Sequence, residues 1–267
     1  MKKTILLTGA TDGIGLATAK ALASQGHDLL LHGRNPEKLA AAEAAVAAVP
    51  GAAVVAGYLA DLSRMEAAES LAEAVIGGHP SLDVVINNAG ILKTPDPVTP
   101  DGLDIRFAVN TLAPYLLTKR LLPALGPAGR VVNLSSAAQA PVDLEAMRGK
   151  VRLEDMAAYA QSKLALTMWS RALALQESGK IIVAVNPGSL LASKMVQEGF
   201  GVAGGDIGIG ADILTRAALS DEFATATGLY FDNDAGRFGP PHPDALDGTK
   251  AASLLQVMDS ILADLSR

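Results

Sequence analysis

A tyrosine and a lysine stand four residues apart in the run MAAYAQSKLALTMWSRALALQ, whose alanine and leucine content is typical of a helix. On a helix, residues i and i+4 project from the same face, so Tyr159 and Lys163 are predicted to lie within reach of each other. A phenol has an ordinary pKa of about 10, and a nearby cation lowers it, which suits a general acid or base. Taken alone, however, the spacing favours a solvated lysine beside a half-buried tyrosine.

A glycine-rich turn, TGATDGIG, ends the first apolar run and directly precedes the first predicted helix. Gly9, Gly13 and Gly15 allow a tight turn and let the backbone approach a pyrophosphate at the helix N-terminus. The spacing is Gly-x3-Gly-x-Gly, and a tight strand-to-helix turn alone would also use glycine. The position at the first strand and first helix favours a dinucleotide site.

The second apolar run ends in HGRN, where an NAD-selective protein would often carry an acid for the ribose 2′-hydroxyl. Arg34 stands there, 19 residues beyond Gly15, and an arginine accepts a 2′-phosphate instead. NADP(H) is therefore predicted in preference to NAD(H). The simpler interpretation is an exposed arginine in a turn, and the nearby Glu37 argues weakly against the phosphate.

Short apolar runs alternate with longer Ala-rich helical patterns along the whole chain. Most runs are rich in Val, Ile and Leu without strict alternation, as strands buried on both faces are. The predicted strands are 3–8, 27–33, 52–58, 82–88, 130–135, 180–186 and 227–232. The predicted helices are 13–25, 36–48, 63–77, 102–125, 156–178, 207–220 and 249–265. This order predicts one α/β domain, 1–267, with a doubly wound, Rossmann-type, seven-stranded parallel sheet and helices on both faces.

Two long connections interrupt the alternation, and both follow a predicted strand. The segment 188–210 is rich in glycine, and long ordered loops at the carboxyl ends of strands are usually binding loops or lids. Its apolar residues predict an apolar substrate; they are Leu190, Leu191, Met195, Val196 and Phe200. For the inserted segment 137–155, a surface insertion without a binding role is as good an interpretation as a binding loop. The segment FDNDAGRFGPPHPDAL near the C-terminus has no role that its sequence settles; its aromatic and proline residues would either close over the substrate site or contact a neighbouring subunit.

Composition excludes several classes of function. The 267 residues include no cysteine, which removes disulfides and thiolate chemistry and fits a reducing compartment. The net charge is −6 without a basic stripe, so neither nucleic acid nor an anionic membrane is an expected partner. The apolar part of MKKTILL is too short for a signal peptide, and a cytoplasmic location is the expectation. The four scattered histidines predict no metal site, and no GxSxG or GxxxxGK motif is present.

Six motifs follow one another in the order found in the short-chain dehydrogenases/reductases, which the chain resembles over nearly its whole length. The motifs are TGATDGIG, NNAG at 87–90, Asn110, the serine pair after VVN, YAQSK, and NPG at 186–188. The long serine-to-tyrosine link and NTLAPYLLT after Asn110 are most similar to retinol-dehydrogenase-like and protochlorophyllide-reductase-like members. The resemblance implies an enzyme that interconverts a carbonyl and an alcohol on a small molecule by hydride transfer.

By this resemblance, Tyr159 is the general acid or base, and Lys163 lowers its pKa and binds the nicotinamide ribose. Ser136 would donate a hydrogen bond to the substrate oxygen, as a small oxyanion hole does, and it matches the family's serine better than Ser135. Asn110 would hold a water that links Lys163 to solvent. An asparagine in a helix also satisfies buried backbone groups, so a structural role for Asn110 stays open.

The resemblance also implies the cofactor site. Its residues are Gly9, Thr11, Asp12, Gly13, Ile14, Gly15, Arg34, Asp61, Leu62, Asn88, Ala89, Gly90, Tyr159, Lys163, Pro187 and Gly188. Asp61 would meet the adenine, although it could equally cap the next helix. The chain departs from the family's pattern at two places. Ala192 and Ser193 lie near the position where the family commonly has a threonine. Asp12 stands where family members that use NADP often carry a basic residue.

Family members often form dimers or tetramers through the helix that carries Tyr159 and Lys163 and the helix after it, so a homodimer or homotetramer is expected. Trp169 on that helix would serve the interface or the core. The alternative from another class is a dinucleotide-binding sensor or scaffold without turnover. Such a protein would keep the glycines and lose the Ser136, Tyr159 and Lys163 set, and here the set is intact.

Overall fold

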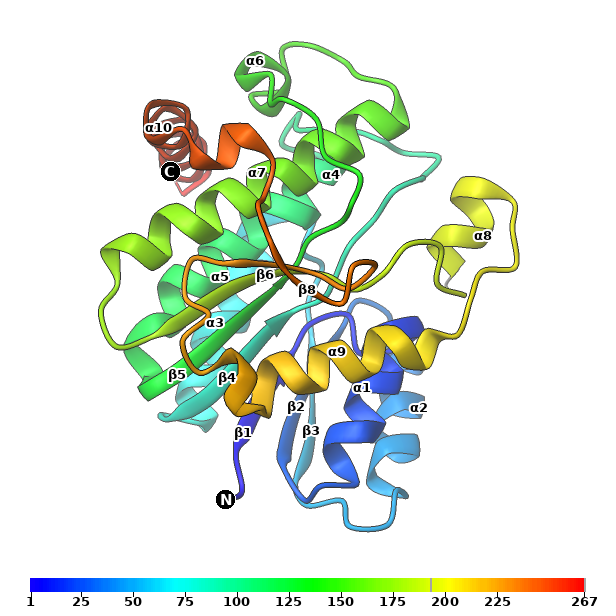
Figure 1. The fold of residues 1–267 in the computed structure, drawn as a ribbon. Helices are drawn as coiled ribbons and strands as arrows, with labels where there is room; N and C mark the ends of the chain where they lie inside the picture. Colours follow the sequence, from blue (N-terminus) through cyan, green and yellow to red (C-terminus); the bar gives the residue numbers. More distant parts are fainter. Residues whose placement is uncertain (193, 267) are drawn as a thin grey trace.

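The strands form one sheet in the order β3-β2-β1-β4-β5-β6-β7-β8 in the computed structural model, which describes residues 1–192 and 194–266 (Figure 1). The strands are β1 Thr4–Leu7, β2 Asp28–Gly33, β3 Val55–Leu59, β4 Leu82–Asn87, β5 Leu125–Leu134, β6 Ile181–Asn186, β7 Tyr230–Asp232 and β8 Arg237–Gly239. All neighbours pair in parallel except β7 and β8. The α/β class, the doubly wound parallel sheet and each of the seven predicted strands are thus confirmed.

The prediction of seven strands is wrong by one. The additional strand, β8, runs antiparallel to β7 and is only three residues long. It lies in the segment FDNDAGRFGPPHPDAL, whose glycines and prolines leave too few apolar residues to show a strand pattern.

Helices cover both faces of the sheet (Figure 1). They are α1 Gly13–Ala23, α2 Pro36–Ala47, α3 Met65–Gly78, α4 Ile105–Phe107, α5 Ala113–Leu121, α6 Leu144–Met147, α7 Asp155–Gln176, α8 Lys194–Phe200, α9 Ile207–Leu219 and α10 Gly248–Leu265. The pattern 102–125 does not form one helix, because a π-helical segment, η1 (Ala108–Leu112), separates α4 from α5. The short helices α6 and α8 lie inside the two long connections, 137–155 and 188–210.

Alternate side chains of the strands point to the two helical layers, as they must on a pleated sheet. Leu6 of β1 packs in the cluster of α3, α5, α7 and α10. Ile5 and Leu7 pack in the opposite cluster with α1, α2 and α9. Trp169 of α7 is fully buried and meets Tyr115 edge-on, with ring centres 5.5 Å apart, so it belongs to the core.

The strand order reverses between β1 and β4, which lie side by side although three helices and two strands separate them in the chain. In open α/β sheets, ligands bind outside the carboxyl ends of the strands at such a switch point. The turns after β1 and β4 therefore form the base of the candidate site.

Among the described residues, no helix combines the length and the apolar character that crossing a membrane requires.

Candidate active site

A pocket of about 970 Å³ opens at the carboxyl ends of the strands. Every predicted cofactor-binding residue lines it, and so does Ser136. Asn110 lies just behind the wall, where its side-chain oxygen would be 3.4 Å from a Cβ added to Gly90. Five of the six motifs thus line one cavity and the sixth, Asn110, lies directly behind it, although they are spread over about 180 residues of sequence.

The glycine turn is shaped as a cradle. Gly9 and Gly13 have φ values of +65° and +54°, a region that favours glycine. A Cβ added to Gly15 would lie 2.1 Å from the Gly9 carbonyl oxygen. Backbone therefore occupies the place of side chains where α1 begins, and this geometry fits a pyrophosphate held at a helix N-terminus.

The turns after β1 and β4 are joined by one asparagine. The Asn88 amide donates to the carbonyl oxygens of Thr8 and Gly9 at 2.9 and 3.0 Å. The Thr8 hydroxyl in turn accepts from the backbone N–H groups of Asn88 and Ala89, both at 3.1 Å. These bonds fix the glycine turn against the NNAG turn without any ligand.

His32, which the sequence did not single out, supports the glycine turn from β2. Its Nδ1 accepts from the Gly9 N–H at 3.2 Å, so its Nε2 carries the proton and donates to the Ala60 carbonyl oxygen at 3.0 Å. Burial lowers the pKa of His32 to about 4, despite the opposing effect of its bond to Ala60. The imidazole is neutral at pH 7.

We expect acid to destabilise the fold through His32. The pKa is about 4 in the folded state against 6.5 in the unfolded chain, so the stabilisation is complete above pH 6.5 and is lost as pH falls through 4. The loss amounts to about 3 kcal/mol. Urea unfolding between pH 4 and 7.5, compared with His32→Gln, measures it, because the carboxyl groups common to both proteins cancel. Equal pH slopes for both proteins would contradict the assignment.

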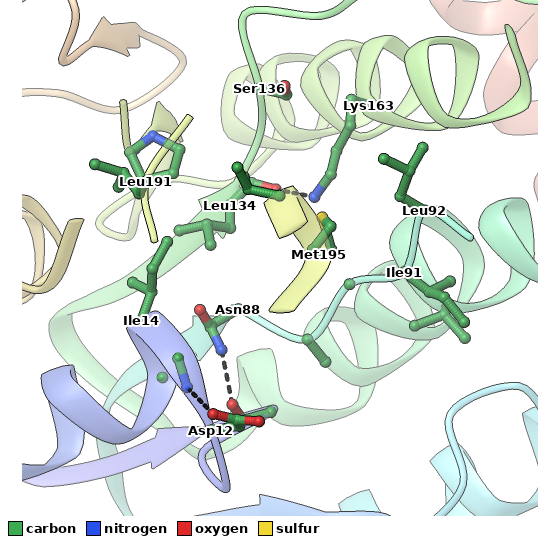
Figure 2. A pocket seen from close by; sticks show the side chains of 18 of the residues that line it. Asp12, Ile14, Asn88, Ile91, Leu92, Leu134, Ser136, Lys163, Leu191 and Met195 are labelled. Carbon is green, nitrogen blue, oxygen red and sulfur yellow. Dashed lines mark hydrogen bonds between the residues drawn. The ribbon is translucent and has the colours of Figure 1, made fainter. Parts of the chain in front are cut away.

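Tyr159, Lys163 and Ser136 meet at the end of the pocket remote from the glycine turn. Lys163 reaches from α7 into the cavity and donates to the Leu134 carbonyl oxygen at 2.7 Å (Figure 2). Its Nζ lies 5.7 Å from the centre of the Tyr159 ring. Ser136 follows β5, and its hydroxyl lies close enough to the phenol to lower the pKa of that group.

Burial governs the protonation of this group. It raises the pKa of the Tyr159 phenol, and the nearby Ser136 hydroxyl offsets part of the increase. It lowers the pKa of Lys163 to about 8, so this lysine is still mostly charged at pH 7. The site therefore holds a protonated phenol beside a cation, which suits donation of a proton to an oxygen.

The two serines after VVN have different environments. The Ser135 hydroxyl is buried and pairs with the Thr167 hydroxyl at 2.7 Å. Ser136 faces the phenol and accepts from the Ala138 N–H at 3.1 Å. The geometry thus favours Ser136 as the serine that faces a substrate.

The Asn110 side chain lies within the π-helical segment η1 and binds the turn after β4. It accepts from the Ile91 N–H at 2.8 Å and donates to the Ile91 carbonyl oxygen and the Ser162 hydroxyl, both at 2.9 Å. Both amide hydrogens are used in these bonds. Asn110 therefore satisfies buried polar groups, and its part in a water relay stays a prediction.

The opposite end of the pocket carries the charges of the dinucleotide site. Arg34 lines it, and so does Lys38, in the first turn of α2, which the sequence analysis missed. Asp61 also lines it and accepts from the Ser63 N–H at 3.0 Å. Asp61 is not the cap of the next helix, because the N-cap of α3 is Arg64, without a side-chain cap bond.

The end near Tyr159 is largely apolar. Leu190, Leu191, Met195 and Val196, from the 188–210 connection, line it as predicted. Further apolar lining residues that the sequence did not indicate are Ile91 and Leu92 (Figure 2), together with Met156. Of the other predicted contacts, Ser193 and the side chain of Phe200 lie outside the described residues.

The inserted segment 137–155 borders the pocket only at its start, through Ala137 and Ala138. Farther along, the Asp143 N–H donates to Gln161 of the YAQSK motif at 2.9 Å. The insertion therefore packs on the first turns of α7 and forms little of the cavity.

A buried arginine fixes the N-terminus of α7. Arg106 is 1% exposed and binds both oxygens of Asp104, at 2.8 and 2.6 Å. Its Nη1 donates to Asp155, the first residue of α7, and to the carbonyl oxygen of the pocket residue Leu92 at 3.3 Å. Since Asp155 stands one turn before Tyr159, Arg106 connects the wall of the pocket to the helix that carries the phenol.

Known proteins share this architecture. The family model of the short-chain dehydrogenases matches residues 3–200. Human retinol dehydrogenase 13 is 32% identical over 94% of this chain and 82% of its own length. A metagenomic short-chain oxidoreductase in complex with NADP is 32% identical, with a TM-score of 0.61 over 81% of this chain and 90% of its own. A Shigella flexneri short-chain dehydrogenase complexed with NADP is 28% identical, with a TM-score of 0.68 over 86% and 96%.

The family model covers well over half of the chain, and the retinol dehydrogenase aligns along nearly all of it. The shared fold and the shared motifs lead to the same assignment: the chain belongs to the short-chain dehydrogenase/reductase family, in its retinol-dehydrogenase- and protochlorophyllide-reductase-like branch.

Proposed function

We propose that this protein is an NADP(H)-dependent oxidoreductase that interconverts a carbonyl and an alcohol on a small apolar molecule. The observation that carries the proposal is the meeting of Tyr159, Lys163 and Ser136 in the same pocket as the glycine cradle. Membership of the family and its oxidoreductase members support it.

The nicotinamide cofactor, when bound, supplies or accepts the hydride. In the direction of reduction, Tyr159 gives its phenolic proton to the carbonyl oxygen, and in oxidation it takes the proton from the alcohol. Ser136 donates a hydrogen bond to the same oxygen and so stabilises its developing charge. The charge of Lys163 stabilises the phenolate that remains after proton transfer.

Arg34 and Lys38 support the preference for NADP(H). Both cations line the end of the pocket near the glycine cradle, where a 2′-phosphate would be bound. Two of the related structures are NADP complexes, which agrees with this assignment. Asp12 is the opposing charge on that side, and its carboxylate accepts from the Gly13 N–H at 2.7 Å.

Replacing Arg34 with alanine is expected to raise KM for NADPH about 10- to 100-fold, because a hydrogen bond to a charged group contributes about 1.5–3 kcal/mol. KM for NADH should change little, since NADH lacks the 2′-phosphate. Lys38→Ala should behave in the same way with a smaller effect. Initial rates with both cofactors measure the ratio, and Lys20→Ala, an exposed lysine outside the pocket, is the matched control. A parallel loss with NADH would contradict the phosphate role.

The substrate end of the pocket supports an apolar, uncharged substrate. Among the described residues, the lining of this end is mainly Leu, Ile, Met, Val and Ala, and Lys163 is the one charged side chain at this end. A carboxylate on the substrate would lose its hydration without a free cation to replace it, because Lys163 already serves the phenol.

The test of the function is NADPH oxidation against aldehydes, ketones and quinones with apolar bodies. Consumption of NADPH with formation of the corresponding alcohol is the expected result. NADPH binding without consumption of any of these compounds would favour a sensor or scaffold instead.

A cytoplasmic location and a homodimer or homotetramer are further parts of the proposal. An interface through α7 would have to include or displace α10, because α10 packs on α7. The helix α10 is also bound to α5, where the Tyr115 hydroxyl donates to Asp259 at 3.0 Å.

A further inference from the structure

The hairpin of β7, β8 and their connecting turn, 233–236, contacts both loops that flank the proposed nicotinamide end of the pocket. We propose that this hairpin is a positioning element of the active site, and that Asp234 is the residue through which it fixes the turn Asn186–Ser189. The inference rests on the proposed function, because that turn contains Pro187 and Gly188 of the expected cofactor site.

Asp234 binds the turn at three points. One carboxylate oxygen accepts from the Ser189 N–H at 2.7 Å. The other accepts from the Ser189 hydroxyl at 2.5 Å and from the Asn186 amide at 3.0 Å. Partial burial opposes ionisation, yet these bonds hold the pKa of Asp234 below its ordinary value. A charged acceptor that serves three donors makes the strong type of hydrogen bond.

Two further residues of the hairpin bind the same turn. The Asn186 amide also donates to Asp232 at 2.9 Å, and the Asn233 amide donates to the Pro187 carbonyl oxygen at 2.9 Å. Asn186, Pro187 and Ser189 are thus held from one side by three successive residues, 232–234. Gly188 lies between them with φ +118°, where another residue would be strained.

The second loop is the one that carries Ser136. The Tyr230 hydroxyl donates to the Ser136 carbonyl oxygen at 3.2 Å, and the Gln139 amide donates to the same oxygen at 2.8 Å. Tyr230 and Asp232 alternate with Phe231 along β7, so both polar contacts project from one face of the strand.

The other face of β7 makes the hairpin firm. Phe231 is fully buried, and its ring centre lies 5.2 Å from that of Phe223 and 5.0 Å from that of Phe238 on β8. Aromatic packing of this kind fixes the strand to the core. The hairpin therefore presents its polar residues from a rigid base, which is what a positioning role requires.

The position of Ser189 gives this contact its effect on the pocket. The next residue, Leu190, has φ +51°, and its carbonyl oxygen accepts from the Gly205 N–H at 2.7 Å. The Ala192 N–H donates back to the Gly205 carbonyl oxygen at 2.8 Å. These bonds join the two ends of the segment 190–205, which carries the pocket residues Leu191, Met195 and Val196. Asp234 binds Ser189, the residue directly before this segment.

The proposal is tested with the variants Asp234→Ala and Asp234→Asn. Arg237→Ala is the matched control, because Arg237 is an exposed residue of β8 in the same hairpin. Asp234→Ala is expected to raise the Kd for NADPH about tenfold, measured by fluorescence titration. The Ser189 amide should exchange its hydrogen at least tenfold faster, because that N–H loses its acceptor. The asparagine variant, which keeps one carbonyl acceptor, should lie between wild type and alanine in both measurements.

The two measurements separate this inference from the proposed function. Wild-type protein that fails to bind NADPH would remove the proposed function, whereas the exchange of Ser189 would still report on the contact. Normal NADPH binding by wild type, with Asp234→Ala matching Arg237→Ala in Kd and in exchange, would overturn the inference. A lower unfolding temperature without a selective change at Ser189 would also overturn it, since that result describes a merely structural residue.

Discussion

Replacing Tyr159 with phenylalanine is expected to lower kcat by a factor of about 10² to 10⁴, the usual contribution of a positioned acid or base. The change removes one hydroxyl from a buried ring and leaves the ring packing intact. The charge of Lys163 and the glycine cradle remain, so the Kd for NADPH should stay within about threefold. Steady-state rates and fluorescence titration of the same preparation measure the two quantities.

Tyr115→Phe is the matched control for this experiment. Tyr115 is also buried, but its hydroxyl donates to Asp259 of α10 and it does not line the pocket. Its loss should affect stability and leave kcat unchanged. A Tyr159→Phe protein that kept more than half of its kcat would exclude the phenol as the proton donor.

The second large effect concerns Arg106. Changing it to methionine leaves Asp104 as a buried carboxylate without its partner, and breaking a buried ion pair in this way costs about 3–5 kcal/mol. The free energy of unfolding should fall by that amount, and the unfolding temperature by about 10 °C. Urea unfolding followed by circular dichroism measures the change.

Two comparisons sharpen the Arg106 experiment. Lys119→Met breaks an ion pair to Asp259 whose side chains are 44% and 50% exposed, and it should cost no more than about 1 kcal/mol. The double change Asp104→Asn with Arg106→Met removes both charges and should recover part of the loss. If Arg106→Met cost no more than Lys119→Met, the buried pair would not stabilise the fold.

The main strands and the motif residues could be predicted from the sequence because each depends on neighbours in the chain. A strand such as Leu29–Leu31 is an apolar run between turn residues, and Gly9 is needed by its own backbone angle. Lys38 was also within reach: the segment GRNPEK has an N-cap and a first-turn proline, which place this lysine one helical turn beyond Asn35.

Other parts depend on contacts between distant residues, which no local pattern records. The bond from Tyr230 to Ser136 joins residues 94 apart, and that from Ser189 to Asp234 joins residues 45 apart. His32 had no neighbouring residue to indicate its role, because its partners are Gly9 and Ala60. Only the parallel pairing of β1, β2 and β3 brings those three residues together.

The π-helical segment η1 has a consequence for how the gene can change. In η1 the Ala113 N–H binds the Ala108 carbonyl oxygen, five residues back, so the segment carries one residue more than a regular α-helix. Deleting one codon from 108–112 would let the segment close into a regular α-helix, which keeps α4 and α5 nearly in register but moves the side chains inside the segment. Asn110 would leave Ile91, and Thr111 would leave the Ser162 carbonyl oxygen that it binds at 2.8 Å. Substitutions in this stretch should therefore be tolerated more readily than deletions.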